Sequence, residues 1–138
     1  IFVGGGTPTL LREPLWGQLL NTMRSLHLFE HLQEFTVEAN PETVTSSMMT
    51  IFAAAGVNRI SLGAQSFNTQ LLKTLERWHD PASVASAVPV IRDAGIDNIN
   101  LDLIFAIPGQ TLTMLEADLD AVLSLKPDHV SVYNPTPR

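Results

Sequence analysis

The chain has 138 residues, of which 45% are hydrophobic and 16% are charged, a balance that suits one domain with a sizeable buried core. Its formal net charge of −6 and the lack of any run of lysine or arginine exclude a generic nucleic-acid or anionic-membrane binder, since such surfaces need clustered positive charge. No window approaches the roughly 20 apolar residues of a membrane span, so we expect no transmembrane segment and a cytoplasmic location.

Apolar stretches typical of strands alternate along the chain with segments of helical period. In chain order, strands are expected at 1–3, 34–39, 58–65, 98–107 and 129–133, and between them helices at 14–28, 43–55, 68–77, 81–94 and 111–125. This alternation predicts an α/β fold built on a parallel sheet. The segment 55–62 is echoed by 94–101, each a helix end, a glycine turn and a strand, which favours a barrel or an open sheet.

Capping residues support several of these boundaries. Gly56 is expected to end its helix in the left-handed conformation, and Gly95 to close the helix over 81–94. Asp80 and Pro81 form a suitable pair of N-cap and first helical residue for that same helix. Pro89 lies inside it, and we expect a kink or a break there, because proline lacks a backbone donor and crowds the preceding turn.

Three consecutive predicted strands carry polar residues on one face. Because alternate residues of a strand point the same way, this face comprises Thr36, Glu38, Asn40, Ser61, Gly63, Gln65, Asn100 and Asp102. Parallel strands are usually covered on both sides and continuously hydrophobic, so the pattern is unexpected for a plain core. Burying Glu38 or Asp102 without partners would be costly. The polar face is therefore a candidate site, toward the carboxyl ends of the strands.

The stretch IFVGGGTPTLL opens the chain, and its three glycines follow directly on a predicted strand. Glycine at such a place lets the backbone adopt a positive φ and approach a ligand closely. The segment lacks the Gly-Lys-Ser/Thr of a P-loop and the G-x-G-x-x-G spacing of a dinucleotide site. From the residues alone, a ligand-binding loop and a simple tight turn both stay open.

Five blocks in fixed order carry a resemblance to a known family: GGGTPTLL, EFTVEANPETVT, GVNRISLGAQSFNTQLLKTLERWH, NINLDLIFAIPGQT and PDHVSVY. Over nearly its whole length the chain resembles the oxygen-independent coproporphyrinogen III oxidase family of radical S-adenosylmethionine (SAM) enzymes. That family includes HemN-type oxidases and HemW-type proteins proposed as heme chaperones. The resemblance implies a partial TIM-like (βα)6 barrel of the radical SAM type, with strands two to six of that barrel in this chain.

The resemblance also implies which residues bind SAM. In related proteins, the loop that matches Gly4, Gly5, Gly6 and Thr7 hydrogen-bonds the amino group of the methionyl moiety. The residue that matches Glu38, in the E-x-[ND]-P segment, also faces SAM. These five positions are therefore expected to form the methionyl end of a SAM site.

Three further positions match SAM contacts of the oxidases, partly at a second SAM molecule. They are Gln65, Arg77 and Asp102. Arg77 has an equally plausible alternative as the surface ion-pair partner of Glu76 or Asp80. We therefore expect a SAM site that draws on the ends of several strands.

Family members carry a Cys-x3-Cys-x2-Cys loop, upstream of the glycine motif, that holds a [4Fe-4S] cluster. This chain has no cysteine, so no thiolate-ligated metal is expected within it, and the cluster cysteines are expected to lie upstream of Ile1. We expect 1–138 to be a single domain, the central part of a radical SAM barrel, cut from a longer protein and missing the first strand, the cluster loop and the C-terminal domain. The intact protein is expected to use an electron donor such as a flavodoxin or ferredoxin, and the fragment alone to be inactive.

The branch of the family is suggested by QSFN followed by LERWH, which resembles the HemW-type pattern better than the oxidase pattern. His79 would belong to that pattern, with a place beside the Asp80 helix cap as the alternative. Ala106 stands where the family usually has glycine, and Pro135 and Arg138 depart from the HemW-type pattern. Three functions stay open: a radical SAM oxidase acting on a porphyrinogen, a chaperone that binds heme, and another radical SAM enzyme or a binding barrel without a cluster.

Other conspicuous residues are expected to be structural. The four methionines lie at helical positions and should fill the core. His27 and His31 should lie on a solvated face rather than bind a metal, because no third ligand is near. Trp16 and Trp78 are expected to be packing anchors rather than stacking platforms for nucleic acid, since no basic residues are interleaved with them.

Overall fold

The computed structural model describes residues 1–134 of the chain. Its strands form one five-stranded sheet in the order β1-β2-β3-β4-β5, and every neighbouring pair is parallel. The strands span Phe2–Val3 (β1), Thr36–Ala39 (β2), Arg59–Gln65 (β3), Asn98–Ile104 (β4) and His129–Tyr133 (β5). The α-helices span Glu13–Ser25 (α1), Ser46–Ala55 (α2), Thr69–Thr74 (α3), Pro81–Asp93 (α4) and Leu112–Ser124 (α5), with 3-10 turns at Pro8–Leu10 (η1) and Pro41–Thr43 (η2). The predicted parallel α/β fold is confirmed. Pro135 and Arg138, on which the sequence analysis commented, lie outside the described residues.

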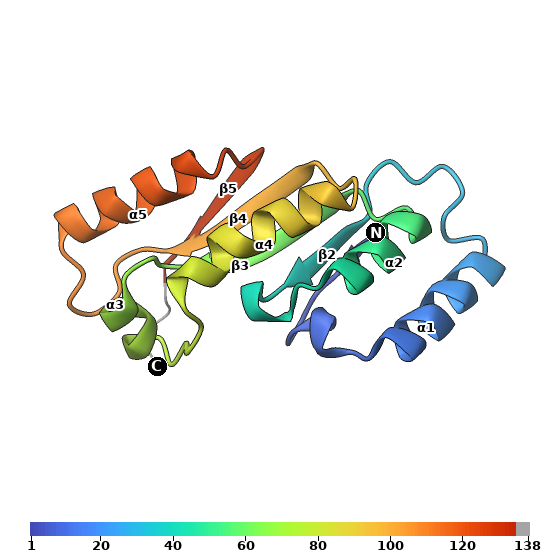
Figure 1. Cartoon of the computed structure of the whole chain (residues 1–138), viewed down its shortest axis with the longest axis horizontal. Helices are drawn as coiled ribbons and strands as arrows, with labels where there is room; N and C mark the ends of the chain where they lie inside the picture. Colours follow the sequence, from blue (N-terminus) through green and yellow to red (C-terminus); the bar gives the residue numbers. More distant parts are fainter. Residues whose placement is uncertain (135–138) are drawn as a thin grey trace.

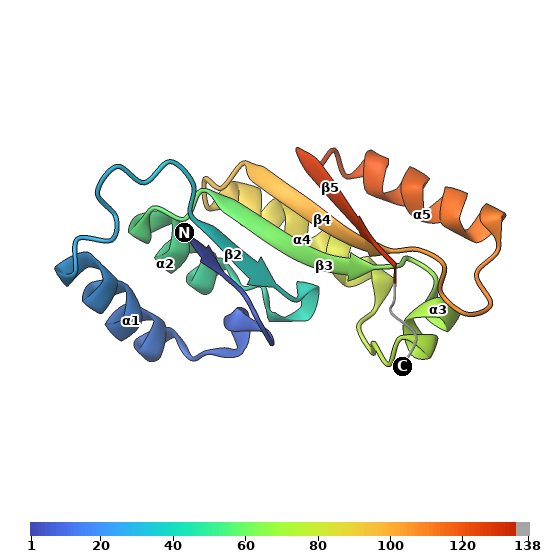
Figure 2. The ribbon, with the colours of Figure 1, turned by 180° about the vertical axis from the view of Figure 1, so that it is seen from behind.

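In the described part of the chain, the helices cover one face of the sheet and leave the other without a helical layer. In Figure 1, α2 and α4 lie in front of the strands, whereas in Figure 2, turned by 180°, the strands lie in front of these helices. Helices α1 and α5 lie at opposite ends of the layer in both views. No helix within residues 1–134 combines the length and the apolar character needed to cross a membrane.

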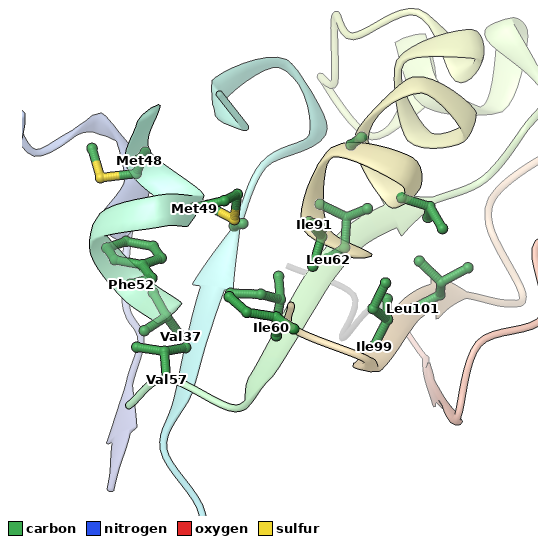
Figure 3. Packing of buried hydrophobic residues seen from close by; sticks show 14 of the residues in the cluster. Val37, Met48, Met49, Phe52, Val57, Ile60, Leu62, Ile91, Ile99 and Leu101 are labelled. Carbon is green, nitrogen blue, oxygen red and sulfur yellow. The ribbon is translucent and has the colours of Figure 1, made fainter. Parts of the chain in front are cut away.

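The hydrophobic core lies between the sheet and this helical layer (Figure 3). Alternate strand residues supply the sheet side and α2 and α4 the other side, including Val37, Ile60, Leu62, Ile99 and Leu101 from the strands and Met48, Met49, Phe52 and Ile91 from the helices. Trp16 of α1 meets the ring of Phe52 edge to face, with the ring centroids 4.7 Å apart. Burial of each such large side chain contributes about 1.5–3 kcal/mol. The core confirms the predicted strand parity, since it leaves the polar residues on the opposite face.

Side chains that cap helices set several boundaries. Asp80 accepts a hydrogen bond from the backbone amide two residues on at 2.9 Å, as the predicted N-cap should. The helix expected from 43 begins at Ser46, because Thr45 caps it and the preceding residues form the separate turn η2. Gly56 ends α2 with φ of +92°, in the predicted left-handed conformation.

Of the kink or break expected at Pro89, the break does not occur: α4 is one continuous helix over Pro81–Asp93. Pro89 removes the donor that would reach the carbonyl of Ala85, and both residues lie on the exposed side of α4. Water can therefore satisfy that carbonyl. The helix keeps its other side, with Val84, Val88 and Ile91, in the core.

The tryptophans differ from each other. Trp16 is buried, as expected, but Trp78 is 79% exposed and is not a packing anchor. It follows α3 in a segment where the next residue, His79, turns inward, so Trp78 faces solvent. His27 and His31 are exposed as predicted, and of the methionines only Met48 and Met49 are buried, while Met23 packs at the edge of the core and Met114 is half-buried.

Strand β4 ends at Ile104, earlier than predicted, because the chain turns at Ala106. The φ of Ala106 is +57°, in the left-handed region, where a Cβ crowds the following carbonyl. The position thus has the conformation that glycine adopts without strain, consistent with the glycine expected there from the family pattern. The departure at Ala106 therefore adds backbone strain and leaves the turn itself intact.

We predict that Ala106→Gly raises the free energy of unfolding by about 0.5–1 kcal/mol, since relief of left-handed strain exceeds the entropy that glycine adds to the unfolded chain. Urea unfolding followed by circular dichroism measures this. Ala85→Gly, in the exposed middle of α4, is the matched control and should lower the same quantity by about 1 kcal/mol. Equal losses in the two variants would contradict the account of Ala106.

Candidate functional site

A polar cavity of about 180 Å³ lies on the face of the sheet opposite the helices, at the carboxyl ends of the strands. Its lining comes from the loop after β1, the ends of β2, β3 and β4, and the segment after α3. The lining residues are Gly6, Thr7, Pro8, Glu38, Ala39, Asn40, Ser61, Gly63, Gln65, Arg77, His79 and Asp102. Because all the strands are parallel, their carboxyl ends meet here, and loops far apart in the sequence share one site.

Most of the predicted site residues come together in this cavity. Those that line it are Gly6, Thr7, Glu38, Gln65, Arg77 and Asp102. Gly4 and Gly5 lie instead on an adjoining, more apolar groove, which Thr7 and Pro8 share with the cavity. The glycine loop thus separates the two hollows: Gly6 lines the polar cavity, Gly4 and Gly5 line the apolar groove, and Thr7 lines both.

Ile1 lies at the other end of β1 from the glycine loop. Its backbone nitrogen donates a hydrogen bond to the carbonyl oxygen of Glu34 at 2.7 Å, which joins the amino ends of β1 and β2. Ile1 does not line the cavity, which is at the carboxyl ends of the strands. The contacts of Ile1 do not test whether the cluster cysteines lie upstream of it, so that expectation stays a prediction.

The glycine loop and Glu38 are built around each other. The Gly5 amide donates a hydrogen bond to Glu38 Oε2 at 2.9 Å. A Cβ on Gly4 would lie 2.6 Å from the same oxygen and 2.5 Å from the ring of Phe2, so only glycine leaves room for the carboxylate there. Gly5 and Gly6 have φ of +89° and +62°, conformations that favour glycine. The simple tight turn left open by the sequence is therefore an incomplete description, because the loop also positions a carboxylate.

Gln65 reaches the cavity through an irregular end of β3. The pairing of β3 with β4 shifts register between Gly63 and Gln65, and the φ of Gln65 is +62°. A Cβ on Gly63 would lie 2.7 Å from Gln65 Nε2, so the amide of Gln65 occupies the space that Gly63 leaves. Non-glycine residues held in this region of φ are strained and cluster at functional sites. The bulge re-aims Gln65 into the cavity.

Asp102 is held by a connected set of polar side chains on the same face. Its Oδ2 accepts from Ser61 Oγ at 3.0 Å and its Oδ1 from Asn100 Nδ2 at 2.7 Å. Asn100 Nδ2 also donates to Ser61 Oγ at 2.8 Å. Asn100 Oδ1 in turn accepts from Ser131 Oγ at 3.0 Å and contacts His129 Nδ1 at 2.5 Å. The strand parity that identified Asn100 and Asp102 also applies to His129 and Ser131, which our sequence analysis did not single out as site residues.

Arg77 and His79 reach the cavity from the segment after α3. His79 is buried, and its Nε2 lies 3.1 Å from the carbonyl oxygen of Ala64, so the ring fixes the backbone next to Gln65. Within residues 1–134, Arg77 forms no ion pair, so the alternative partners considered from the sequence do not hold it. Its guanidinium is the cation of the cavity lining.

The charges of the cavity suit a ligand that carries groups of both signs. Glu38 and Asp102 offer carboxylates to a cationic group, and Arg77 and loop amides offer donors to an anionic one. The methionyl part of SAM has an ammonium, a sulfonium and a carboxylate, so these residues fit it. They do not fit an iron–sulfur cluster: the chain has no cysteine, and residues 1–134 contain no group of three or more histidines and carboxylates that could hold a metal ion.

We predict that Gly4→Ala lowers the free energy of unfolding by about 1–3 kcal/mol, because the added Cβ displaces the Glu38 carboxylate and overpacks the loop. Urea unfolding measures the loss, and a shift of the Gly5 amide resonance reports the broken hydrogen bond. Gly17→Ala in α1, where an added Cβ meets nothing within 4 Å, is the control and should stabilise the protein. An unchanged Gly5 resonance in Gly4→Ala would contradict this description of the loop.

Comparison with known proteins agrees with the geometry. The sequence model of the radical SAM superfamily matches residues 1–122. The heme chaperone HemW of Bacillus subtilis (strain 168) is 43% identical over 135 residues, which are 97% of this chain and 36% of that protein. HemW of Lactococcus lactis subsp. lactis (strain IL1403) is 42% identical over 134 residues, 97% of this chain and 35% of that protein. The chain thus spans about a third of the length of these relatives.

Solved structures show the same fold. The radical SAM coproporphyrinogen III oxidase HemN from Escherichia coli superposes with a TM-score of 0.85 at 30% identity, covering 98% of this chain and 31% of that one. Elp3 of the archaeon Methanocaldococcus infernus gives 0.80 at 19% identity, covering 97% of this chain and 36% of that one, a likeness of fold alone. The predicted radical SAM type of sheet is confirmed. This chain belongs to the radical SAM superfamily.

Proposed function

We propose that the polar cavity binds S-adenosylmethionine, with its methionyl group against the glycine loop and Glu38. Membership of the radical SAM superfamily implies SAM and a [4Fe-4S] cluster as cofactors. The observation that carries the proposal is the convergence of Gly6, Thr7, Glu38 and Asp102 on one cavity from the ends of β1, β2 and β4. Their charges and donors complement those of the ligand, as described above.

Each residue has a distinct part in this proposal. Backbone groups of Gly6 and Thr7 and the carboxylate of Glu38 would bind the ammonium group, and Arg77 would neutralise the ligand's carboxylate. Asp102, oriented by Ser61 and Asn100, would accept hydrogen bonds from SAM. Gln65 and the loop of Gly4 and Gly5 would complete the walls.

When bound beside a reduced [4Fe-4S] cluster, SAM supplies a 5′-deoxyadenosyl radical. The part of this chain is to bind and orient SAM, because it has no cysteine to ligate the cluster. In the proposal the thiolates lie upstream of Ile1, outside these 138 residues, in line with the expectation that 1–138 is the central part of a longer barrel. The electron donor, such as a flavodoxin or ferredoxin, and the cytoplasmic location are proposals on the same footing.

For the whole protein we propose a HemW-like function, the handling of heme. Its support is the similarity to the HemW heme chaperones, at 42% and 43% identity over nearly the whole chain, which exceeds the 30% identity to HemN. The sequence QSFN and the pair Arg77 and His79 belong to the same resemblance. The partner would then be a tetrapyrrole, bound without chemical change.

The second candidate is oxidative decarboxylation of a porphyrinogen propionate, the reaction of the oxidase branch. It is favoured by the TM-score of 0.85 with HemN over 98% of this chain. Both candidates are compatible with the proposed SAM site, so the cavity does not distinguish them. They differ in what happens to the tetrapyrrole.

We predict that Glu38→Ala weakens SAM binding about 10- to 100-fold, since loss of a charge-assisted hydrogen bond costs roughly 1.5–3 kcal/mol. Isothermal titration calorimetry of the purified protein with SAM measures the dissociation constant. Glu42→Ala is the control, because Glu42 is exposed on η2 and does not line the cavity. SAM binding that is equally tight in Glu38→Ala and Glu42→Ala would overturn the proposed site.

A second experiment separates the two candidates. We predict that the intact protein, reconstituted with its [4Fe-4S] cluster, binds heme stoichiometrically, seen as a Soret band that saturates on titration, and that it does not convert coproporphyrinogen III when supplied with SAM and a reductant. Release of carbon dioxide from coproporphyrinogen III under the same conditions would instead establish the oxidase function. If the protein neither binds heme nor turns over coproporphyrinogen III, both candidate functions are excluded.

A further inference from the structure

We infer that Asp118 of α5 is a positioning residue for the site: its buried carboxylate holds the turn after β3 and thereby aims Gln65 into the cavity. The inference rests on the proposed function, because Gln65 is proposed to contact SAM. Asp118 itself does not line the cavity. It acts on the ligand only through the backbone of the turn.

The contacts of Asp118 reach two consecutive residues of that turn. Its Oδ2 accepts from Ser66 Oγ at 2.7 Å, and its Oδ1 accepts from the Phe67 amide at 2.7 Å. Ser66 Oγ also accepts from the Asn68 amide at 3.1 Å. Asp118 is only 2% exposed and Ser66 is fully buried. Both carboxylate oxygens are therefore used for the residues that directly follow Gln65.

The buried carboxylate of Asp118 is costly, so its presence requires a physical explanation. Within residues 1–134 it has no ion-pair partner, so its charge is balanced by hydrogen bonds alone. An apolar side chain of similar size would fill the same position without the desolvation cost of a buried charge. The carboxylate instead fixes the orientation of the turn relative to α5, because its two short charge-assisted hydrogen bonds allow one geometry.

That geometry matters because the turn is strained at Gln65. The residue has φ of +62° and lies at the register shift between β3 and β4. On its N-terminal side, His79 Nε2 contacts the carbonyl oxygen of Ala64 at 3.1 Å. His79 thus contacts the peptide group before Gln65, whereas Asp118 holds the Ser66 side chain and the peptide group between Ser66 and Phe67. Such strain persists only when the surrounding structure over-determines the conformation.

The test compares Asp118→Ala with Asp120→Ala, which removes an exposed carboxylate from the same helix. Calorimetric titration of the purified protein with SAM should show about tenfold weaker binding for Asp118→Ala and no change for Asp120→Ala. Asp118→Asn keeps the size and one acceptor, so it should fold as the wild type and weaken binding less. Hydrogen exchange of the Phe67 amide should be fast in Asp118→Ala and slow in Asp120→Ala.

A double-mutant cycle with Gln65→Ala shows whether the effect passes through Gln65. We expect Gln65→Ala to weaken SAM binding in the wild type and to add little in the Asp118→Ala background, because the two residues act as one unit. Fold-changes that multiply would overturn the inference, as would Asp118→Ala and Asp118→Asn binding SAM like Asp120→Ala. If the wild type itself does not bind SAM, the proposed function fails, and the Phe67 exchange alone then decides whether Asp118 holds the turn: slow exchange without the carboxylate would refute it.

Discussion

The structure depends on the one-sided cover of its parallel sheet. Helices pack against one face, and the residues of that face form the apolar core around Ile60, Leu62 and Leu101. Within residues 1–134 the other face has no helical layer, so the alternation of each strand sends Glu38, Ser61 and Asp102 to a surface that can hold polar groups. A sheet covered on both sides would not tolerate these carboxylates without partners, because each would lose its hydration. One-sided cover therefore makes the polar cavity possible.

The polar face is then organised by fixed local geometry. Gly4 leaves the space for the Glu38 carboxylate, and Gly63 leaves the space for the Gln65 amide. Each carboxylate of the cavity has a donor that sets its direction, the Gly5 amide for Glu38 and the Asn100 amide for Asp102. Preorganised groups of this kind lose little freedom when a ligand arrives, which favours binding. The proposed SAM site is the same for a chaperone and for an oxidase.

Much of this was accessible from the sequence, because it depends on periodicity. The order and type of the elements follow from hydrophobic spacing, and the polar face follows from strand parity. The predictions that were wrong concern residues whose setting depends on neighbours far away in the sequence. A proline inside a helix is tolerated when its side is solvated, as at Pro89, and Trp78 is exposed because His79 takes the inward position. The sequence analysis missed Asp118. It lies three residues after Leu115 and four before Val122 on α5, the spacing of the buried side of a helix, and an acidic residue on that side indicates a specific buried partner. The partner of that carboxylate, a turn 51 residues away, is visible only in the fold.

We propose that the polar cavity holds S-adenosylmethionine between the glycine loop and Asp102. The most direct measurement is a crystal structure of the protein grown with SAM. We expect ligand density in the cavity, with the methionyl ammonium within hydrogen-bond distance of Glu38 or of the Gly6 and Thr7 backbone. Density for SAM elsewhere, such as the opposite end of the sheet at Asn58 and Asp97, with the cavity left to solvent, would contradict it.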